Sequence, residues 1–377
     1  MRTLKISKEN LHAQIVKMIR DGKAESRANL AKMLKVAPST MSIYVDQLIA
    51  TGWMREAGLM QGKTGRPKVR LALDGGSGWF AGLEFTASRL QMVSIDFSGK
   101  AIDAHVCPIP HGATTETVIQ TLQDTLRKAT AMIDRPLLGI GVGVPGLVDP
   151  IKGTVRYSVI FPGLNDIPLQ KTLEQALEVP VRIENNMRVV AMAERWFGGG
   201  RNENDFAILG PRSGFAIAQV RDGKLVTGAH HAVGETGLWP WATPDGERQL
   251  HQVLSAPTTW RRLAGKMPDA AIPSDLNDAL AELANHDSMA WHEVVNDFAR
   301  AVGMSHLLID AGIYYLHGPL VALGTRFCDA ISQRALALMP ALRDTPVRVV
   351  PTTLGDSAGG LGAASLAMEA WDPGLAD

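Results

Sequence analysis

The sequence has little cysteine and no long apolar run. Cys107 and Cys328 are its only cysteines and lie far apart, so neither a disulfide framework nor a CxxC metal pair is expected. No stretch reaches the roughly 18 apolar residues that indicate a transmembrane helix. The first ten residues lack the apolar core of a signal peptide, so we expect a cytoplasmic protein with no membrane partner. A chain of 377 residues is long enough for two or three domains.

The chain also lacks a net charge, but its charges are unevenly distributed. Residues 1–73 hold 14 Lys and Arg against five Asp and Glu, which leaves 24 basic and 33 acidic residues for the rest. A basic segment on an acidic body is typical of a nucleic-acid-binding module joined to a soluble domain. A solvated basic face without a partner would give the same charges, so charge alone leaves both interpretations open.

Three short helices are predicted in the basic segment. Apolar residues recur at helical spacing from Asn10 to Arg20. Ser26 can cap a second helix over 27–34, and Pro38 suits the first turn of a third that ends near residue 50. The outer face of the third helix carries hydroxyl side chains, which can approach phosphates and base edges in a major groove. We therefore predict DNA contacts from Ser39, Thr40, Ser42 and Tyr44.

Two short strands, over 54–57 and 69–73, follow the helices, and a loop with three glycines and three cations joins them. Arg66, between a glycine and a proline, is suited to a narrow minor groove. Lys63 and Lys68 are suited to phosphates. Helices, loop and charge together predict a winged helix-turn-helix DNA-binding domain over residues 1–76, and hence a transcription regulator.

Residues 77–377 alternate predicted strands and helices, which indicates an α/β body. Ser98-Gly99 predicts a hairpin between two of the first three strands. A second lobe is expected to start with a strand over 320–323. The main predicted strands are 79–85, 89–96, 101–109, 138–144, 181–183, 206–209, 215–220, 320–323 and 347–350, and the main predicted helices are 115–133, 169–177, 185–197, several within 250–310, 326–338 and 359–370.

Three segments of the body resemble the ROK family (repressors, open reading frames and kinases). They are Gly139–Gly146, Glu184–Asn186 and Gly228–Gly237, in the order and spacing of the family. Residues 1–76, called the head from here on, contain Gly65-Arg66-Pro67 and resemble the family's regulators of the N-acetylglucosamine and xylose repressor type. The resemblance covers nearly the whole chain. It implies the two-lobed actin-like ATPase fold for residues 77–377, as a domain that binds an effector and forms oligomers.

The catalytic apparatus of the family's sugar kinases is incomplete here. Their Asp-x-Gly-Gly-Thr stretch is Glu84–Ser88, where side chains at Thr86 and Ala87 crowd the place of two glycines that admit phosphate. Their second phosphate loop is replaced by Gly210–Gly214, which contains Pro and Arg. Asn186 replaces the catalytic Asp, and an amide cannot accept the proton of a sugar hydroxyl. We predict a degenerate kinase domain with no catalytic residue, no cofactor and no enzymatic activity.

The family's zinc site is also incomplete. Leu238 stands where the family has a His, and the Cys-rich loop is reduced to Glu247–Gln249. His230, His231 and His251 leave a different metal site open. Three histidines without a thiolate or a recognised ligand spacing are more often loop or hydrogen-bonding residues, so no metal site is predicted.

The remaining polar residues of the resembling pocket can still bind a sugar. Asn185 and Asn186 offer amide donors and acceptors for paired hydroxyls, and Glu235 can accept two hydrogen bonds. The resemblance puts them beside the loop at Gly146, with His251 in place of a further sugar-binding Glu. Alternatively, the two asparagines cap a helix and Glu235 is a turn residue. We predict ligand contacts from Gly146, Asn185, Asn186, Glu235 and His251.

Together these features predict a repressor of a carbohydrate-utilisation operon that a sugar or sugar-derived effector releases. Its expected partners are operator DNA, the effector and further copies of the chain, in a dimer or tetramer. A ROK sugar kinase with a regulatory DNA-binding head is the alternative. A regulator controlled by a protein partner, and an interaction scaffold, also stay open.

Overall fold

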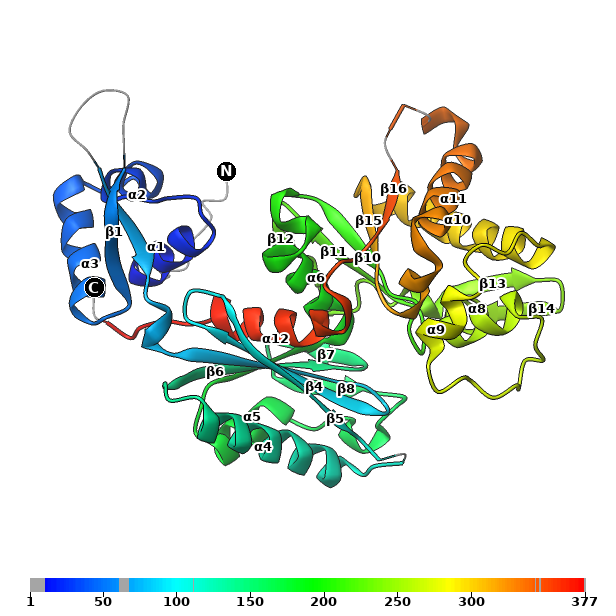
Figure 1. The fold of residues 1–377 in the computed structure, drawn as a ribbon, viewed down its shortest axis with the longest axis horizontal. Helices are drawn as coiled ribbons and strands as arrows, with labels where there is room; N and C mark the ends of the chain where they lie inside the picture. The colour runs from blue at the N-terminus through cyan, green and yellow to red at the C-terminus, as the bar shows by residue number, and fades with distance from the viewer. Residues whose placement is uncertain (1–10, 61–67, 111, 343, 346, 376–377) are drawn as a thin grey trace. The chain divides into compact units, whose positions relative to one another are not determined.

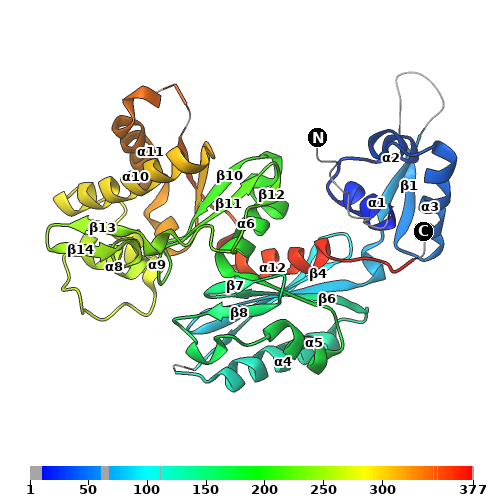
Figure 2. The same ribbon diagram turned by 180° about the vertical axis from the view of Figure 1, so that it is seen from behind.

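The computed structural model describes residues 11–60, 68–110, 112–342, 344–345 and 347–375 (Figures 1 and 2). The chain divides into two compact units. The first comprises Met1–Val142, Pro168–Ile183 and Ala363–Asp377, and the second comprises Gly143–Ile167 and Glu184–Gly362. Among the helices of the described residues, none has the length and apolarity that a membrane span requires.

The first unit begins with three helices and an antiparallel hairpin, as the sequence predicts. Ser26 caps the second helix by accepting a hydrogen bond from the backbone N–H of Asn29, and Pro38 occupies the first turn of the third. Ile15, Leu30 and Met41 are fully buried between the helices. The elements are α1 (Leu11–Arg20), α2 (Arg27–Leu34), α3 (Pro38–Ala50), β1 (Met54–Met60) and β2 (Lys68–Leu73).

Strand β1 is three residues longer than the predicted strand, which ended at Ala57. The register with β2 shifts between Glu56 and Leu59, and pairing then continues to Met60. Gly58 has a φ of +94°, so it fits the irregular backbone of this bulge. The glycine that suggested the start of the loop therefore lies inside the strand.

A five-stranded sheet and the helices beside it form the rest of the first unit, and the strand order is β5-β4-β3-β6-β9. The predicted hairpin is present, because β4 and β5 pair antiparallel. α12 packs closely on β6, since a Cβ on Gly141 would lie 1.7 Å from the carbonyl oxygen of Ala363. The elements are β3 (Trp79–Phe85), β4 (Arg89–Asp96), β5 (Ala101–Pro108), α4 (Thr115–Met132), β6 (Leu137–Val144), α5 (Leu169–Leu177), β9 (Val181–Asn185) and α12 (Ala358–Glu369).

The second unit has its own five-stranded mixed sheet, in the order β12-β11-β10-β15-β16. Strands β10, β15 and β16 are parallel neighbours, whereas β11 pairs antiparallel with β10. The elements are β7 (Leu147–Asp149), β8 (Thr154–Tyr157), α6 (Asn186–Phe197), β10 (Phe206–Leu209), β11 (Ile217–Arg221), β12 (Lys224–Leu225), β13 (Pro240–Thr243), β14 (Gly246–Gln249), α7 (Leu250–Leu254), α8 (Ala256–Leu263), α9 (Leu276–Ala281), α10 (Met289–Ile309), β15 (Ile313–Leu316), α11 (Gly324–Leu338) and β16 (Arg348–Pro351).

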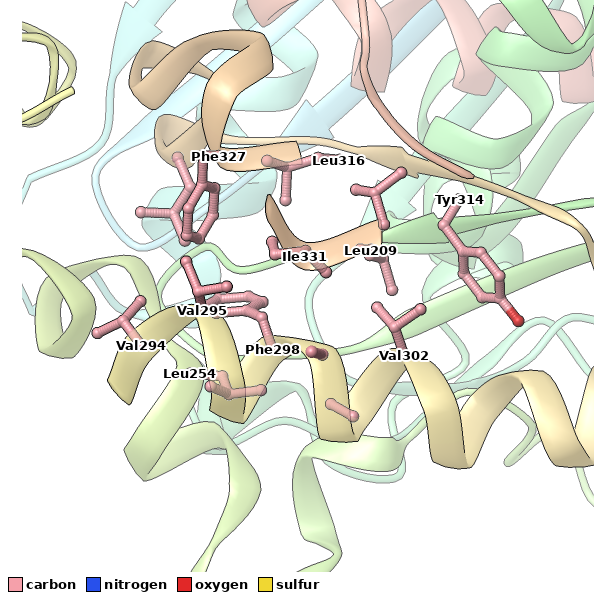
Figure 3. Packing of buried hydrophobic residues seen from close by; sticks show 14 of the residues in the cluster. Leu209, Leu254, Val294, Val295, Phe298, Val302, Tyr314, Leu316, Phe327 and Ile331 are labelled. Carbon is pink, nitrogen blue, oxygen red and sulfur yellow. The ribbon is translucent and has the colours of Figure 1, made fainter. Parts of the chain in front are cut away.

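Helices α10 and α11 pack on this sheet and enclose the core of the second unit (Figure 3). The Phe298 and Phe327 rings meet edge to face, with centroids 5.4 Å apart. Leu209 and Leu316 project from the parallel strands towards them. Buried aromatic pairs of this geometry add about 0.5–1.5 kcal/mol beyond the area that they bury.

The predicted strand over 320–323 is wrong. Residues Pro319–Leu323 form a 3₁₀ helix, η5, and the strand at this point of the chain is Ile313–Leu316. Gly318 has a φ of +105°, and Pro319 has no N–H for a ladder hydrogen bond. Leu320 and Leu323 are fully buried, and their spacing of three residues suits a helical turn.

Candidate ligand site and nucleic-acid interface

Asn185 lies at the centre of the candidate ligand site, as the N-cap of α6. Its Oδ1 accepts hydrogen bonds from the backbone N–H groups of Met187 (2.8 Å) and Arg188 (3.2 Å). Its Nδ2 donates to the carbonyl oxygen of Gly146 (2.8 Å) and lies 3.4 Å from Oε1 of Glu235. The capping interpretation is therefore confirmed for Asn185. The same amide joins Gly146 to Glu235.

Gly146 occupies a position that no other residue fits. Its φ is +131°, and a Cβ there would lie 2.3 Å from the carbonyl oxygen of Tyr157. Gly146 lies close to the end of β8, and its carbonyl accepts the hydrogen bond from Asn185. Gly146, Asn185 and Glu235, three of the five predicted ligand residues, are thus brought together by hydrogen bonds.

Arg188, in the first turn of α6, was missed by the sequence analysis. Its side chain is 2% exposed, and its Nη1 donates to Oε1 of Glu184 at 3.0 Å. Its Nη2 donates to the backbone carbonyls of His231 (2.7 Å) and Val233 (3.1 Å). The arginine therefore fixes the loop that carries Glu235. A Glu and an Arg four residues apart, one before and one after the two asparagines that begin the helix, were the available signal.

Burial raises the pKa of the Glu235 carboxyl, and the positive charge of Arg188 opposes part of that rise. Burial likewise raises the pKa of Glu184, while Arg188 and the backbone N–H of Asn185 lower it. A partly desolvated carboxylate is stabilised when hydroxyl groups donate to it. Glu235 is therefore an acceptor that a polyhydroxylated ligand can satisfy.

Of the other two predicted ligand residues, Asn186 follows Asn185 in the chain, and His251 is joined by one hydrogen bond to the segment that carries Glu235. Asn186 is the first residue of α6 and is half-buried. His251, on α7, is half-buried, and its Nδ1 lies 3.0 Å from the carbonyl oxygen of Gly237, two residues after Glu235. Leu238, which stands where the family has a His, is 59% exposed.

The histidines of this region do not form a metal cluster. His231 has its Nε2 3.7 Å from Oδ1 of Asp149, and the carbonyl of His230 accepts a hydrogen bond from Arg156. Across the described ranges, no three His, Cys, Asp or Glu side chains are grouped so that they could hold a metal ion. The absence of a metal site stays a prediction.

The candidate nucleic-acid interface is the outer face of α3. Ser39 and Thr40 are exposed. The Ser42 hydroxyl donates to the carbonyl of Pro38 at 3.1 Å. The ring of Tyr44 packs on that of His12, with centroids 4.6 Å apart, so Tyr44 also contributes to the contact between α1 and α3.

Of the predicted cations of the loop, Lys68 is exposed at the start of β2. Lys63 and Arg66 lie outside the described residues. Arg27, which the sequence analysis did not single out, forms ion pairs with two carboxylates beside α3. It pairs with Asp46 (2.6 Å) and Glu56 (2.8 Å), and although desolvation alone would lower its pKa, these hydrogen bonds raise it. Arg27 therefore offsets acidic charge next to the interface.

Two units, each built on a five-stranded sheet, define the body as an α/β protein of the actin-like ATPase fold. The ROK family model matches residues 80–370, so the chain belongs to the ROK family. The resemblance carried by the three sequence segments is confirmed.

Known relatives include both regulators and kinases. The chain is 29% identical to the xylose repressor of Caldicellulosiruptor bescii over 228 residues, which cover 59% of this chain and 56% of the repressor. It thus spans about half the length of that relative. It is 27% identical to the glucokinase of Thermotoga maritima over 277 residues, 67% of this chain and 86% of the kinase. A solved ROK family transcriptional regulator, a homolog of the Escherichia coli MLC protein, has the same fold, with a TM-score of 0.78 and 19% identity over 95% of this chain and 96% of its own.

Proposed function

We propose that this protein is a DNA-binding transcriptional regulator that represses a carbohydrate-utilisation operon until a sugar or sugar-derived effector releases it. The proposal rests on one observation, the presence of two different parts in the same chain. One is a basic three-helix segment with a hairpin and an exposed hydroxyl face on α3. The other is a ROK body in which Asn186 stands at the position of the family's catalytic base.

The DNA-binding part is residues 1–76, a winged helix-turn-helix, and the effector-binding and oligomerising part is residues 77–377. In the first part α3 is the recognition helix, with base or phosphate contacts from Ser39, Thr40, Ser42 and Tyr44. Lys63 and Lys68 neutralise phosphates, and Arg66 enters the minor groove. The chain acts in the cytoplasm as a dimer or tetramer, because two heads are needed to read a pseudo-palindromic operator.

Two features besides Asn186 argue against phosphoryl transfer. In the hairpin between β3 and β4, Thr86 donates its N–H to the carbonyl of Arg89 (2.9 Å), and its hydroxyl accepts from the N–H of Arg89 (3.3 Å). A phosphate would need those N–H groups free. In the second loop, the backbone N–H of Arg212 donates to the carbonyls of Gly210 (3.0 Å) and Gly214 (2.9 Å), so it too is not free for a phosphate. We infer that the chain is not an enzyme and needs no cofactor or metal.

The effector binds where Gly146, Asn185 and Glu235 meet, with Asn186 and His251 at its edge. Asn185 already uses its amide oxygen on two backbone N–H groups, so its role is to position Glu235 and Gly146. Asn186 and Glu235 supply the polar groups that distinguish a sugar from an apolar metabolite. Binding changes DNA affinity by the difference in effector affinity between the free and the DNA-bound states.

The test is selection of bound DNA from a random pool by the purified full chain, repeated with candidate sugars. We expect one enriched pseudo-palindrome, and weaker binding to it with at least one sugar. Uniform, salt-sensitive binding to all sequences would mean charge-driven association only and would contradict the proposal. Operator binding that no metabolite alters would favour control by a protein partner.

A sugar kinase with a regulatory head is the second candidate, and the similarity to the Thermotoga maritima glucokinase favours it. A coupled ATP assay with a panel of hexoses distinguishes the two. Turnover at an enzyme-like rate would establish the kinase, and we expect none.

A further inference from the structure

Ile43 is an exposed apolar side chain in the middle of α3. It is 58% exposed, whereas Met41 and Val45, two residues before and after it, are fully buried. At 3.6 residues per turn, Ile43 lies about 200° around the helix from each of them. Its side chain therefore points away from the core of the head. A β-branched residue also lowers helix propensity relative to Ala, so neither packing nor helix formation accounts for it.

The neighbours of Ile43 on the outer face are small or already paired. Ser39 and Thr40, one turn earlier, are exposed hydroxyl residues. Gln47, one turn later, has its Oε1 2.7 Å from Nε2 of His12. Asp46 pairs with Arg27 at 2.6 Å. The side chains that α3 has available for a groove are therefore mainly hydroxyls and the Ile43 side chain.

This composition limits what α3 can read. The helix contains no Arg, Lys or Asn, and the amide oxygen of Gln47 already pairs with His12, so bidentate contacts with guanine or adenine are not available from it. Hydroxyls donate and accept, and so discriminate weakly between bases. The C5-methyl group of thymine is the apolar group that standard bases present in the major groove, and it matches an apolar side chain.

We propose that Ile43 selects thymine in each operator half-site by packing against its C5-methyl group. The inference rests on the proposed function, since it needs a head that prefers an operator. It assigns the selection of an A·T pair to one side chain of α3.

The experiment replaces the thymines of the selected operator, one at a time, with deoxyuridine, which lacks only the methyl group. Binding is measured with the full chain and with the variants Ile43→Ala, Ile43→Val and Met33→Ala. Met33 is a matched control, because it is an apolar residue of the neighbouring α2 and is 46% exposed. Ile43 is exposed, and Ala favours helix, so Ile43→Ala is expected to fold normally.

One thymine per half-site is expected to matter. Burying a methyl-sized group contributes about 0.8 kcal/mol, so its replacement should weaken binding about fourfold per half-site in the unsubstituted chain and in Met33→Ala. Ile43→Val should keep most of this ratio. Ile43→Ala should bind thymine and deoxyuridine operators equally.

Two results would overturn the inference, and they differ in what else they affect. If the unsubstituted chain shows no operator preference at all, the proposed function fails together with this inference. If it prefers an operator but Ile43→Ala keeps the fourfold ratio between thymine and deoxyuridine, only the role of Ile43 is wrong.

Discussion

Replacement of Arg20 by alanine is expected to loosen the N-terminal helices from the sheet of the first unit. Arg20 is the last residue of α1, and its Nη1 and Nη2 donate to the backbone carbonyls of Met368 (3.1 Å) and Phe97 (2.9 Å). Its guanidinium lies 4.9 Å from the centroid of the Phe97 ring. Burial lowers the pKa of Arg20 to about 10, and nearby acidic residues, Asp21 first among them, oppose that shift.

The expected loss follows from these contacts. A hydrogen bond from a charged donor contributes about 1.5–3 kcal/mol, and a cation–π contact about 0.5–2 kcal/mol. Arg20 as a whole residue is only partly buried, so the lower ends of these ranges apply. With two such hydrogen bonds and one ring contact, the variant Arg20→Ala should lose about 3.5 kcal/mol, which is a factor of more than 100 in the docked population.

Guanidinium denaturation, monitored by near-ultraviolet circular dichroism, measures the effect. The signal comes from the aromatic cluster of Trp53, Phe97 and Trp371 beside Arg20, whose ring centroids lie 4.7–4.9 Å apart. Arg20→Ala should lower the midpoint and reduce the native signal. Arg55→Ala, at an exposed position of β1, is the matched control and should change neither. An unchanged midpoint and signal in Arg20→Ala would refute the reasoning.

Three further predictions concern the ligand site. Glu235→Gln should raise the thermal midpoint at pH 7. The pKa of Glu235 is higher in the native than in the unfolded state, so its contribution to stability is complete below the unfolded pKa and is lost as the pH rises through the native pKa. The difference in midpoint between the variant and the unsubstituted chain should therefore vanish in acid. Arg188→Met should lower the free energy of unfolding in urea by about 3–5 kcal/mol, because it leaves the buried Glu184 without its partner. Adding Glu184→Gln should restore part of this stability, whereas two additive losses would mean that the pair is not coupled. Asn186→Asp should not create hexokinase activity in a coupled ATP assay, because the backbone N–H groups of Thr86 and Arg212 stay hydrogen-bonded within the two phosphate loops. Measurable turnover would contradict that explanation.

Local signals predicted the head well. Caps, a proline at a first helical position and apolar spacing act over a few residues, and Ser26 and Pro38 perform these roles in the structure. The predicted strand over 320–323 failed because buried leucines three residues apart suit a helical turn as well as a short strand. Gly318 and Pro319 were the decisive local features.

The pairing of side chains distant in sequence was not predictable. Arg27 reaches Asp46 and Glu56, 19 and 29 residues away, and Arg188 reaches His231, 43 residues away. These contacts depend on how helices and loops pack, which periodicity does not specify. The place of Asn185 beside Gly146 and Glu235 was expected only from family resemblance, and its commitment to a helix cap emerged from its hydrogen bonds.

The absence of cations on α3 has a consequence for the kinetics of the proposed DNA binding. Long-range attraction to phosphates sets association rates and weakens as salt is added, whereas short-range contacts set residence times. The head carries its positive charge outside α3, and Arg27 compensates the one acidic residue of this helix. Capture of DNA and discrimination between sequences are thereby assigned to different side chains, so a change on α3 can alter the lifetime of a complex without slowing its formation.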